Sequence, residues 1–293
     1  MIGEFIDSWA LFGETYIAAL LIALSTSMLG VLVVTRNQVF AAASISQASL
    51  LGIALSLYFG WSNTIIPVMV LSIAASLLMG RGIITKRGDN EEMTGWVFLV
   101  AASSSVLFLA HHPNGMRELQ SALASSMIGV SMAEVWMLAI VTAIVVVSIG
   151  YYRRPIALFI LDPVMAVAVG MSLASWSFFS SVAVGVLAGL SIKATGMLFT
   201  FGCFVLPAMA ARNFCKELGK MFWVAPVFCL LSVFVALVFS NSRDLPPGQA
   251  GVVTMAVGLV VSWVWKRVRD SIETPIIAEN PSIGASEEEV VHL

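Results

Sequence analysis

The chain has 293 residues, of which 59% are hydrophobic and 11% are charged, and its mean hydropathy is +0.96. This balance excludes a soluble globular domain and predicts an all-α protein that crosses a membrane several times. The net charge of −2 gives no indication of nucleic-acid binding. Three cysteines show neither metal-site spacing nor a disulfide framework, so we interpret them as small apolar core residues: Cys203, Cys215 and Cys229.

Hydrophobic windows predict about nine transmembrane helices, and a count of eight also fits the pattern. In chain order the windows are residues 11–34, 41–59, 64–84, 94–110, 134–150, 173–191, 196–211, 221–239 and 250–265. With the N-terminus outside, the loops on the inside hold 12 of the 15 Lys and Arg residues and the loops on the outside hold three. This asymmetry predicts an external N-terminus and a cytosolic C-terminus.

Residues 156–192 form a run of 37 residues with a single charge, Asp162. The run is too long for one span and too short for two spans with a loop. Asp162 and Pro163 together are a helix-start signal, and Gly170 and Ser172 mark a stop. We therefore predict a short helix over residues 163–171 at the cytosolic face, followed by a span. One long tilted or kinked helix is the alternative interpretation.

Ionisable side chains are absent from the interiors of the predicted spans. All 17 Asp and Glu residues lie in loops, at span ends, in the tail or in the run around Asp162. Ion-coupled carriers and proton pumps usually need such groups at mid-membrane, which argues against a secondary carrier. No Walker sequence is present, so we expect no nucleotide hydrolysis by this chain. No grouping of residues indicates catalysis, and the chain is predicted not to be an enzyme.

Two stretches are unusual for simple spans. Residues 44–49 place four polar side chains near the start of the second window, and Ser44 and Gln47 share one helix face. That face is either contact surface between helices or part of a water-filled pathway. Farther along the chain, Pro207 interrupts the window 196–211 and permits a kink.

Four segments together resemble a known family, the membrane subunits of bacterial zinc/manganese ABC transporters. KATGMLFTFGCFVLPAMAAR (193–212) resembles R-x-V-G-x-L-L-V-x-A-L-L-V-x-P-A-A-x-A-R, and RDLPPGQA (243–250) resembles D-x-P-x-G-P. LDPVMAVAVGM (161–171) resembles D-P-x-x-A-x-x-x-G. GVLVVTRNQVFAAASISQASLLGIAL (30–55) resembles G-x-x-V-x-R-x-x-x-x-x-x-D-A-x-S-H-A-x-L-P-G-x-A. The matches keep their order across about residues 10–265.

The resemblance implies a permease of the bacterial inner membrane that imports zinc or manganese, with iron as a third candidate. It implies pairing with a second permease chain, either a copy or a sister subunit. The other implied partners are two copies of an ATPase subunit and an extracytoplasmic metal-binding protein. ATP would be used by the ATPase, and this chain would bind no cofactor. Asp162, Pro163 and Gly170 would then belong to the helix that couples to the ATPase, while Ser44, Gln47 and Pro207 would line the translocation path.

One departure from the family pattern concerns the metal. The family usually has Asp and His, four residues apart, where this chain has Ala43 and Gln47, and the Pro that follows is Leu51. An alanine and a neutral amide are poor ligands for zinc or manganese. Either a sister chain carries the ligands, or the substrate differs, or binding is transient through Gln47, serines and water. His111 and His112 are a further candidate pair of metal ligands in an external loop.

A non-transporting scaffold or regulator of the same fold is the alternative function, because the usual Asp/His pair is missing. The sequence predicts two regions, of which residues 1–270 form a membrane domain. Residues 271–293 contain five Glu and no Lys or Arg. They are predicted to be a disordered acidic cytosolic tail.

Overall fold

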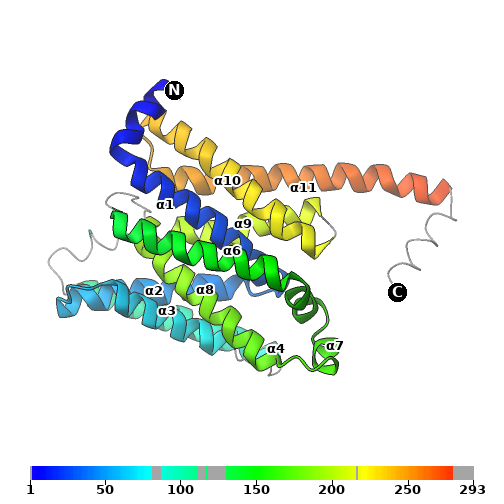
Figure 1. The fold of residues 1–293 in the computed structure, drawn as a ribbon, viewed down its shortest axis with the longest axis horizontal. Coiled ribbons are helices and arrows are strands. Elements are labelled where there is room, and N and C mark those ends of the chain that lie inside the picture. The colour runs from blue at the N-terminus through cyan, green and yellow to red at the C-terminus, as the bar shows by residue number, and fades with distance from the viewer. Residues whose placement is uncertain (1, 81–86, 111–116, 118–129, 216, 280–293) are drawn as a thin grey trace.

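The structure of the chain is a computed structural model that describes residues 2–80, 87–110, 117, 130–215 and 217–279. The described residues form ten helices, which confirms the predicted all-α class (Figure 1). In chain order they are α1 (Ile2–Thr35), α2 (Val39–Phe59), α3 (Ile65–Gly80), α4 (Arg87–Ala110), α6 (Met132–Leu161), α7 (Pro163–Ala168), α8 (Leu173–Thr195), α9 (Met197–Phe214), α10 (Leu218–Arg243) and α11 (Pro247–Glu279).

Each of the nine predicted windows coincides with one of these helices. Eight of the described helices are long and apolar enough to cross a membrane, the lower of the two predicted counts. The ninth is α3, which has 16 residues. At 1.5 Å per residue it is about 24 Å long, shorter than a hydrocarbon core of about 30 Å. Its window extends to residue 84, and residues 81–84 lie outside the described residues.

Helix α6 departs most from its predicted bounds. The window 134–150 was expected to end before a loop containing Arg153 and Arg154, but the helix continues to Leu161. The helix accommodates Pro155 through a kink at Tyr152, whose φ of −94° and ψ of 18° are not helical. A proline removes one helical hydrogen bond and bends the helix without having to end it. The two arginines therefore lie exposed on the last turns of α6.

From Phe12 to Thr35 helix α1 is largely buried, where it packs against α6, α8, α9 and α10. It lies very close to α9 at Gly30, where a Cβ atom would collide with the carbonyl oxygen of Phe204. A similar approach joins α8 to α3, since a Cβ on Gly185 would lie 2.8 Å from the Cα of Ile73. Small residues allow this close packing, which drives helix association where lipid is as apolar as the side chains.

The outer surface of the bundle is apolar. Several large hydrophobic side chains are each more than 60% exposed: Leu99, Leu107, Trp136, Val147 and Leu231. Such a surface is unfavourable in water and suits contact with lipid.

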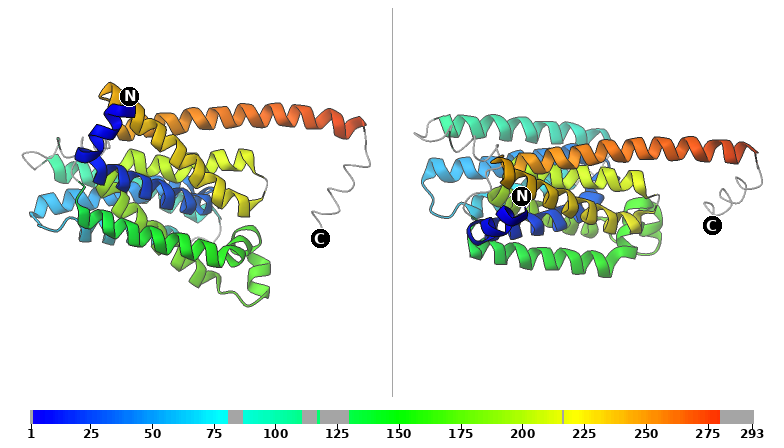
Figure 2. Two further views of the ribbon diagram at one scale, coloured as in Figure 1. Left: turned by 45° about the horizontal axis from the view of Figure 1, so that its top comes forward. Right: turned by 90° about the horizontal axis from the view of Figure 1, so that it is seen from above.

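The N-terminus and α7 lie at opposite ends of the helix bundle, and the far end of α11 extends past the bundle at the α7 end (Figures 1 and 2). This arrangement agrees with the predicted topology, in which the N-terminus is outside and α7 and the C-terminus are cytosolic. Helix α11 continues through Glu279, nine residues into the predicted tail. The division into a membrane domain and a disordered tail stays a prediction.

Candidate coupling and translocation site

The short helix predicted after Asp162 is present as α7. The Oδ1 atom of Asp162 accepts a hydrogen bond of 2.9 Å from the backbone N–H of Met165, and Pro163 occupies the first helical turn. Gly170 has a φ of +84°, a left-handed conformation that favours glycine and ends the helix. Ser172 then caps α8 by accepting from the N–H of Ser175. The alternative of one continuous helix is wrong.

Helix α7 presents an apolar surface at this end of the bundle. Val164 is 81% exposed, and Met165, Val167 and Val169 are also exposed, while Ala166 is fully buried against the protein. One small buried side chain anchors the helix, and the surrounding apolar side chains remain uncovered within the chain. An exposed patch of this kind at the end of a membrane protein is typical of an interaction surface.

A half-buried arginine packs against Phe159, close to the connection to α7. The guanidinium carbon of Arg36, in the α1–α2 turn, is 4.1 Å from the centroid of the Phe159 ring. Phe159 is fully buried three residues before Asp162, and its ring lies 6.3 Å from that of Trp176 in α8. Burial lowers the pKa of Arg36 to about 10, so the side chain is still charged at neutral pH. A cation over an aromatic face is attracted by the ring quadrupole, and burial strengthens the attraction.

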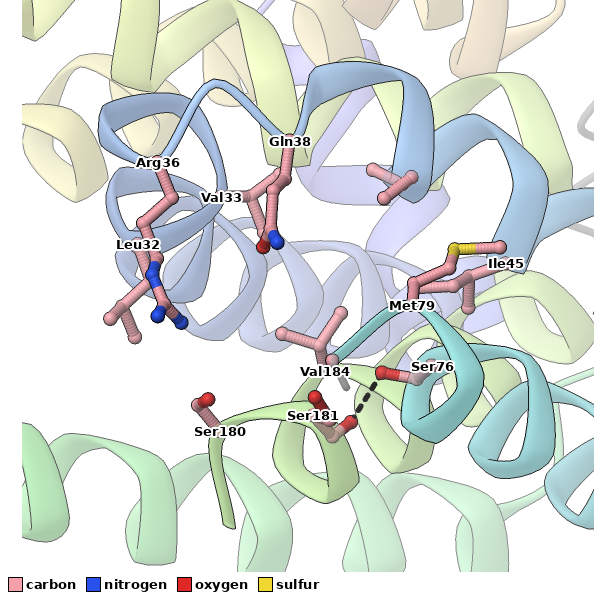
Figure 3. Close-up of a pocket in the computed structure, with 13 residues that line it drawn as sticks. Leu32, Val33, Arg36, Gln38, Ile45, Ser76, Met79, Ser180, Ser181 and Val184 are labelled. Carbon is pink, nitrogen blue, oxygen red and sulfur yellow. Dashed lines mark hydrogen bonds between the residues drawn. The ribbon is translucent and has the colours of Figure 1, made fainter. Parts of the chain in front are cut away.

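Arg36 also lines a cavity at this end of the bundle (Figure 3). The cavity is narrow, with a volume of about 30 Å³, and it is partly open to solvent. Arg36 and Gln38 come from the α1–α2 turn, and Ser180 comes from α8. On the far side the hydroxyl of Ser76 donates a 2.6 Å hydrogen bond to the carbonyl of Ser181, which joins α3 to α8. The cavity thus connects the α1–α2 turn with the segment that follows α7.

The two polar residues predicted to share a face of α2 differ in their contacts. Ser44 is fully buried, and its hydroxyl lies 2.9 Å from the carbonyl of Thr94 in α4 and 3.0 Å from that of Phe40. Ser44 therefore joins two helices. Gln47 is 9% exposed, and its amide makes no hydrogen bond with the described residues. Ala43 is half-buried. Whether either polar residue lines a translocation path stays a prediction.

Pro207 lies buried inside α9, four residues after Cys203. A proline provides no N–H, so the Cys203 carbonyl lacks its usual helical donor. Helix α9 packs against α1, α2, α8, α10 and α11, and thus occupies the middle of the bundle. The contact between α2 and α9 brings together the two helices that carry the predicted path residues.

The candidate metal ligands remain untested. His111 and His112 lie outside the described residues. Within the part of the chain that the structure describes, no group of three or more His, Cys, Asp or Glu side chains is arranged to hold a metal ion. Where the family usually has Asp and His, this chain has the methyl group of Ala43 and the neutral amide of Gln47.

Residues 9–266 match the ABC 3 transport family. The chain belongs to this family. The match reaches every described helix that is long enough to cross a membrane. The predicted family, the multi-pass membrane location and the role as the transport component of an ABC system are therefore confirmed. The ATPase of such a system is a separate chain.

Relatives in this family cover nearly the whole chain at low identity. The manganese transport system membrane protein MntC of Listeria monocytogenes is 22% identical over 86% of this chain and 89% of its own length. The high-affinity zinc uptake system membrane protein ZnuB of Haemophilus influenzae is 23% identical over 86% of this chain and 96% of its own length. The solved structure of PsaBC from Streptococcus pneumoniae in complex with Fab matches 90% of this chain and 95% of that chain with a TM-score of 0.78 and 18% identity.

Two features of this ABC 3 family member were not predicted from its sequence. One is the contact between Arg36 and Phe159. The other is an ion pair of 2.5 Å between Lys193, in the last turn of α8, and Glu134, in the first turn of α6. The only available signal was residue type, because a lone Arg or Lys at a span end has many possible partners.

Proposed function

We propose that the chain is the permease subunit of an importer for a divalent metal ion, manganese or zinc. The observation that carries the proposal is the family match over residues 9–266, together with relatives whose names specify manganese and zinc. Iron is a less supported third substrate.

Two copies of the ATPase would drive transport through α7. The support for this role is the position of α7 at the end of the bundle, its capped N-terminus and its exposed apolar side chains. Arg153 and Arg154 are exposed on the part of α6 that leads toward α7, where they suit acidic groups on a partner. This chain would use no cofactor of its own.

The permease would pair with a sister subunit that supplies the metal ligands, and an extracytoplasmic binding protein would deliver the ion. This proposal rests on Ala43 and Gln47, which are poor replacements for Asp and His as ligands. A homodimer that binds the ion transiently through Gln47 and water is the alternative arrangement.

Uptake of ⁵⁴Mn or ⁶⁵Zn into proteoliposomes tests the function. The vesicles contain this chain, its cognate ATPase and any permease encoded beside it, with ATP or a non-hydrolysable analogue inside. ATP-dependent accumulation is expected, and it should require the sister chain. Accumulation without the sister would contradict the heterodimer. A stable complex with the ATPase that accumulates neither metal would favour a scaffold or regulator, the function suggested by the missing Asp/His pair.

A further inference from the structure

Arg36 carries a positive charge that no acidic side chain of the described residues balances. Its guanidinium makes no hydrogen bond or ion pair with any described residue, and it contacts the ring of Phe159 instead. A ring offers no lone pair, so the N–H groups still lack acceptors. Burial is the cause of the lowered pKa of Arg36, whereas a neighbouring carboxylate would raise that pKa. Within the part of the chain that the structure describes, the side chain therefore has no anionic partner.

The cavity that Arg36 lines has room for part of an anion. Its volume of about 30 Å³ accepts about two water-sized atoms, and it is partly open to solvent. Two oxygen atoms of an anion fit there while the remainder of the molecule stays outside. The fork of an arginine side chain binds two oxygens of one phosphate or carboxylate at the same time. The size of the cavity thus matches the way in which a guanidinium binds an oxyanion.

The surroundings of the cavity add positive potential. The side chains of Arg36 and Gln38 both extend from the α1–α2 turn into the cavity, and the Gln38 amide makes no hydrogen bond with the described residues (Figure 3). Helix α2 begins at the next residue, with no side-chain cap and no acidic residue in its first turn. The free N–H groups of such a helix start favour negative charge. None of the described residues that line the cavity is acidic.

The depth of the cavity favours a phosphate over a carboxylate. The membrane span of α1 is Phe12–Thr35, so Arg36 is the first residue beyond it at the cytosolic end. Lipid phosphates lie at this boundary of the hydrocarbon core. The apolar walls formed by Leu32, Ile45 and Val184 suit the adjoining hydrocarbon. The excess of Lys and Arg in the inside loops attracts anionic lipids of the cytosolic leaflet. A lipid phosphate therefore reaches the cavity without entry of a soluble protein.

We propose that the cavity at Arg36 binds a phosphate group, supplied by the headgroup of an anionic lipid of the cytosolic leaflet. The N–H groups of Arg36 would hold two phosphate oxygens while the contact with Phe159 persists. The site goes beyond the proposed transport function, since it needs neither metal nor ATP. Arg36 and Phe159 join the α1–α2 turn to the segment that leads into α7, so a bound lipid would stabilise these segments relative to each other.

The test uses the full chain purified in dodecyl maltoside, a detergent that contains no phosphate. Titration with short-chain phosphatidylglycerol should raise the thermal unfolding temperature to a plateau, and native mass spectrometry should show one lipid retained per chain. Arg36→Gln should weaken binding by about tenfold or more, the scale for loss of hydrogen bonds to a charged group. Arg36→Lys keeps the charge without the fork, so its affinity should lie between those of the parent and Arg36→Gln.

Arg243→Gln is the matched control for loss of an arginine. Arg243 also lies over a phenylalanine ring, that of Phe239, but it is the last residue of α10, at the predicted external end, and it does not line the cavity. This variant should keep the affinity of the parent. A second titration uses inorganic phosphate in place of lipid. Saturable stabilisation by inorganic phosphate that phosphatidylglycerol does not increase would identify free phosphate as the source and contradict the lipid.

Ala41→Leu keeps the proposal testable if Arg36→Gln fails to fold. The larger side chain fills part of the cavity and leaves Arg36 and Phe159 unchanged, so lipid affinity should fall. Equal affinities of the parent, Arg36→Gln and Ala41→Leu for the lipid, or no binding to the parent, would overturn the proposal. So would weaker ATPase binding by Arg36→Gln without any effect of lipid, which would assign the cavity to an acidic side chain of the ATPase. Lipid binding is measured without metal or ATP, so its failure is distinct from a failure of transport.

Discussion

The guanidinium of Arg36 packs over the ring of Phe159 at 4.1 Å, and this contact joins the α1–α2 turn to the helix end that leads into α7. Phe159 also lies against Trp176 at the start of α8. The segments before and after α7 are thereby fixed to the same aromatic pair. A displacement of α7 by an ATPase would reach α1 and α2 through this contact. Arg36 and Phe159 are thus candidates for positioning residues in energy coupling.

Phe159→Leu should reduce the number of metal ions moved per ATP hydrolysed. The substitution keeps an apolar side chain but removes the aromatic face. A desolvated cation–π contact contributes about 1–2 kcal/mol, so we expect the coupling ratio to fall about fivefold or more. The ratio is measured in proteoliposomes from metal uptake and phosphate release. Phe179→Leu, at an exposed position of α8, is the matched loss of a phenylalanine that lies outside this contact. An unchanged ratio in Phe159→Leu would contradict the positioning role.

The ends of α7 provide a second prediction. Asp162→Ala removes the N-cap and should destabilise the helix by about 1 kcal/mol, whereas Asp162→Asn retains an oxygen acceptor and should have little effect. We expect Asp162→Ala to weaken ATPase binding and uncouple hydrolysis from transport. If Asn and Ala behave alike, the charge of Asp162 matters more than its capping bond.

Gly170→Val tests the other end of α7. The φ of +84° strains any β-branched residue by about 1–3 kcal/mol, so α7 should shift or fray. Gly219→Val is the control, since Gly219 has open space around it and no positive φ. The measurement is ATPase affinity for the permease in nanodiscs. Equal affinities for the two valine variants would show that the turn at Gly170 is not required for docking.

Features that depend on neighbouring residues were predictable from the sequence, whereas contacts between residues far apart in the chain were not. The windows and the α7 start signal depend on neighbours within one or two turns, and each coincides with a helix. The kink in α6 could not be predicted, because a proline either bends or ends a helix according to what packs around it. The Arg36–Phe159 contact and the Glu134–Lys193 ion pair join distant residues, and the fold alone determines such partners.

Ser44 illustrates the same limit within the candidate path. Its position on a polar face of α2 left two interpretations open, and the bond to the Thr94 carbonyl supports contact between helices. Ser44→Ala should lower stability by about 0.6 kcal/mol, the average for hydrogen bonds between membrane helices, and by no more than about 1.7 kcal/mol. Ser46→Ala is the control, because Ser46 bonds only to the carbonyl of Ala42 in its own helix. Unfolding in mixed micelles measures the difference, and equal stabilities would show that the α2–α4 bond contributes little.

Substitution of Gln47, unlike that of Ser44, is expected to affect transport and not stability. Its amide has no bond with the described residues, so Gln47→Leu should leave stability within about 0.5 kcal/mol of the parent. If the amide contacts the ion in transit, the same substitution should lower metal uptake severalfold. A loss of stability without a change in uptake would assign Gln47 to packing. Uptake and unfolding are therefore measured on the same preparation.

Gly30 sets the distance between α1 and α9, the two helices at the middle of the bundle. Any Cβ at this position meets the backbone carbonyl of Phe204, and a backbone atom cannot rotate away as a side chain can. Gly30→Ala should therefore separate the helices and cost about 1–3 kcal/mol or more. Gly150→Ala, which has open space around it, should instead be neutral or slightly stabilising, because alanine favours a helix. Since α9 carries Pro207 and also packs against α2, the Gly30 variant should lose transport even where it still folds. A Gly30→Ala chain with the stability and uptake of Gly150→Ala would show that α1 and α9 are farther apart than the structure places them.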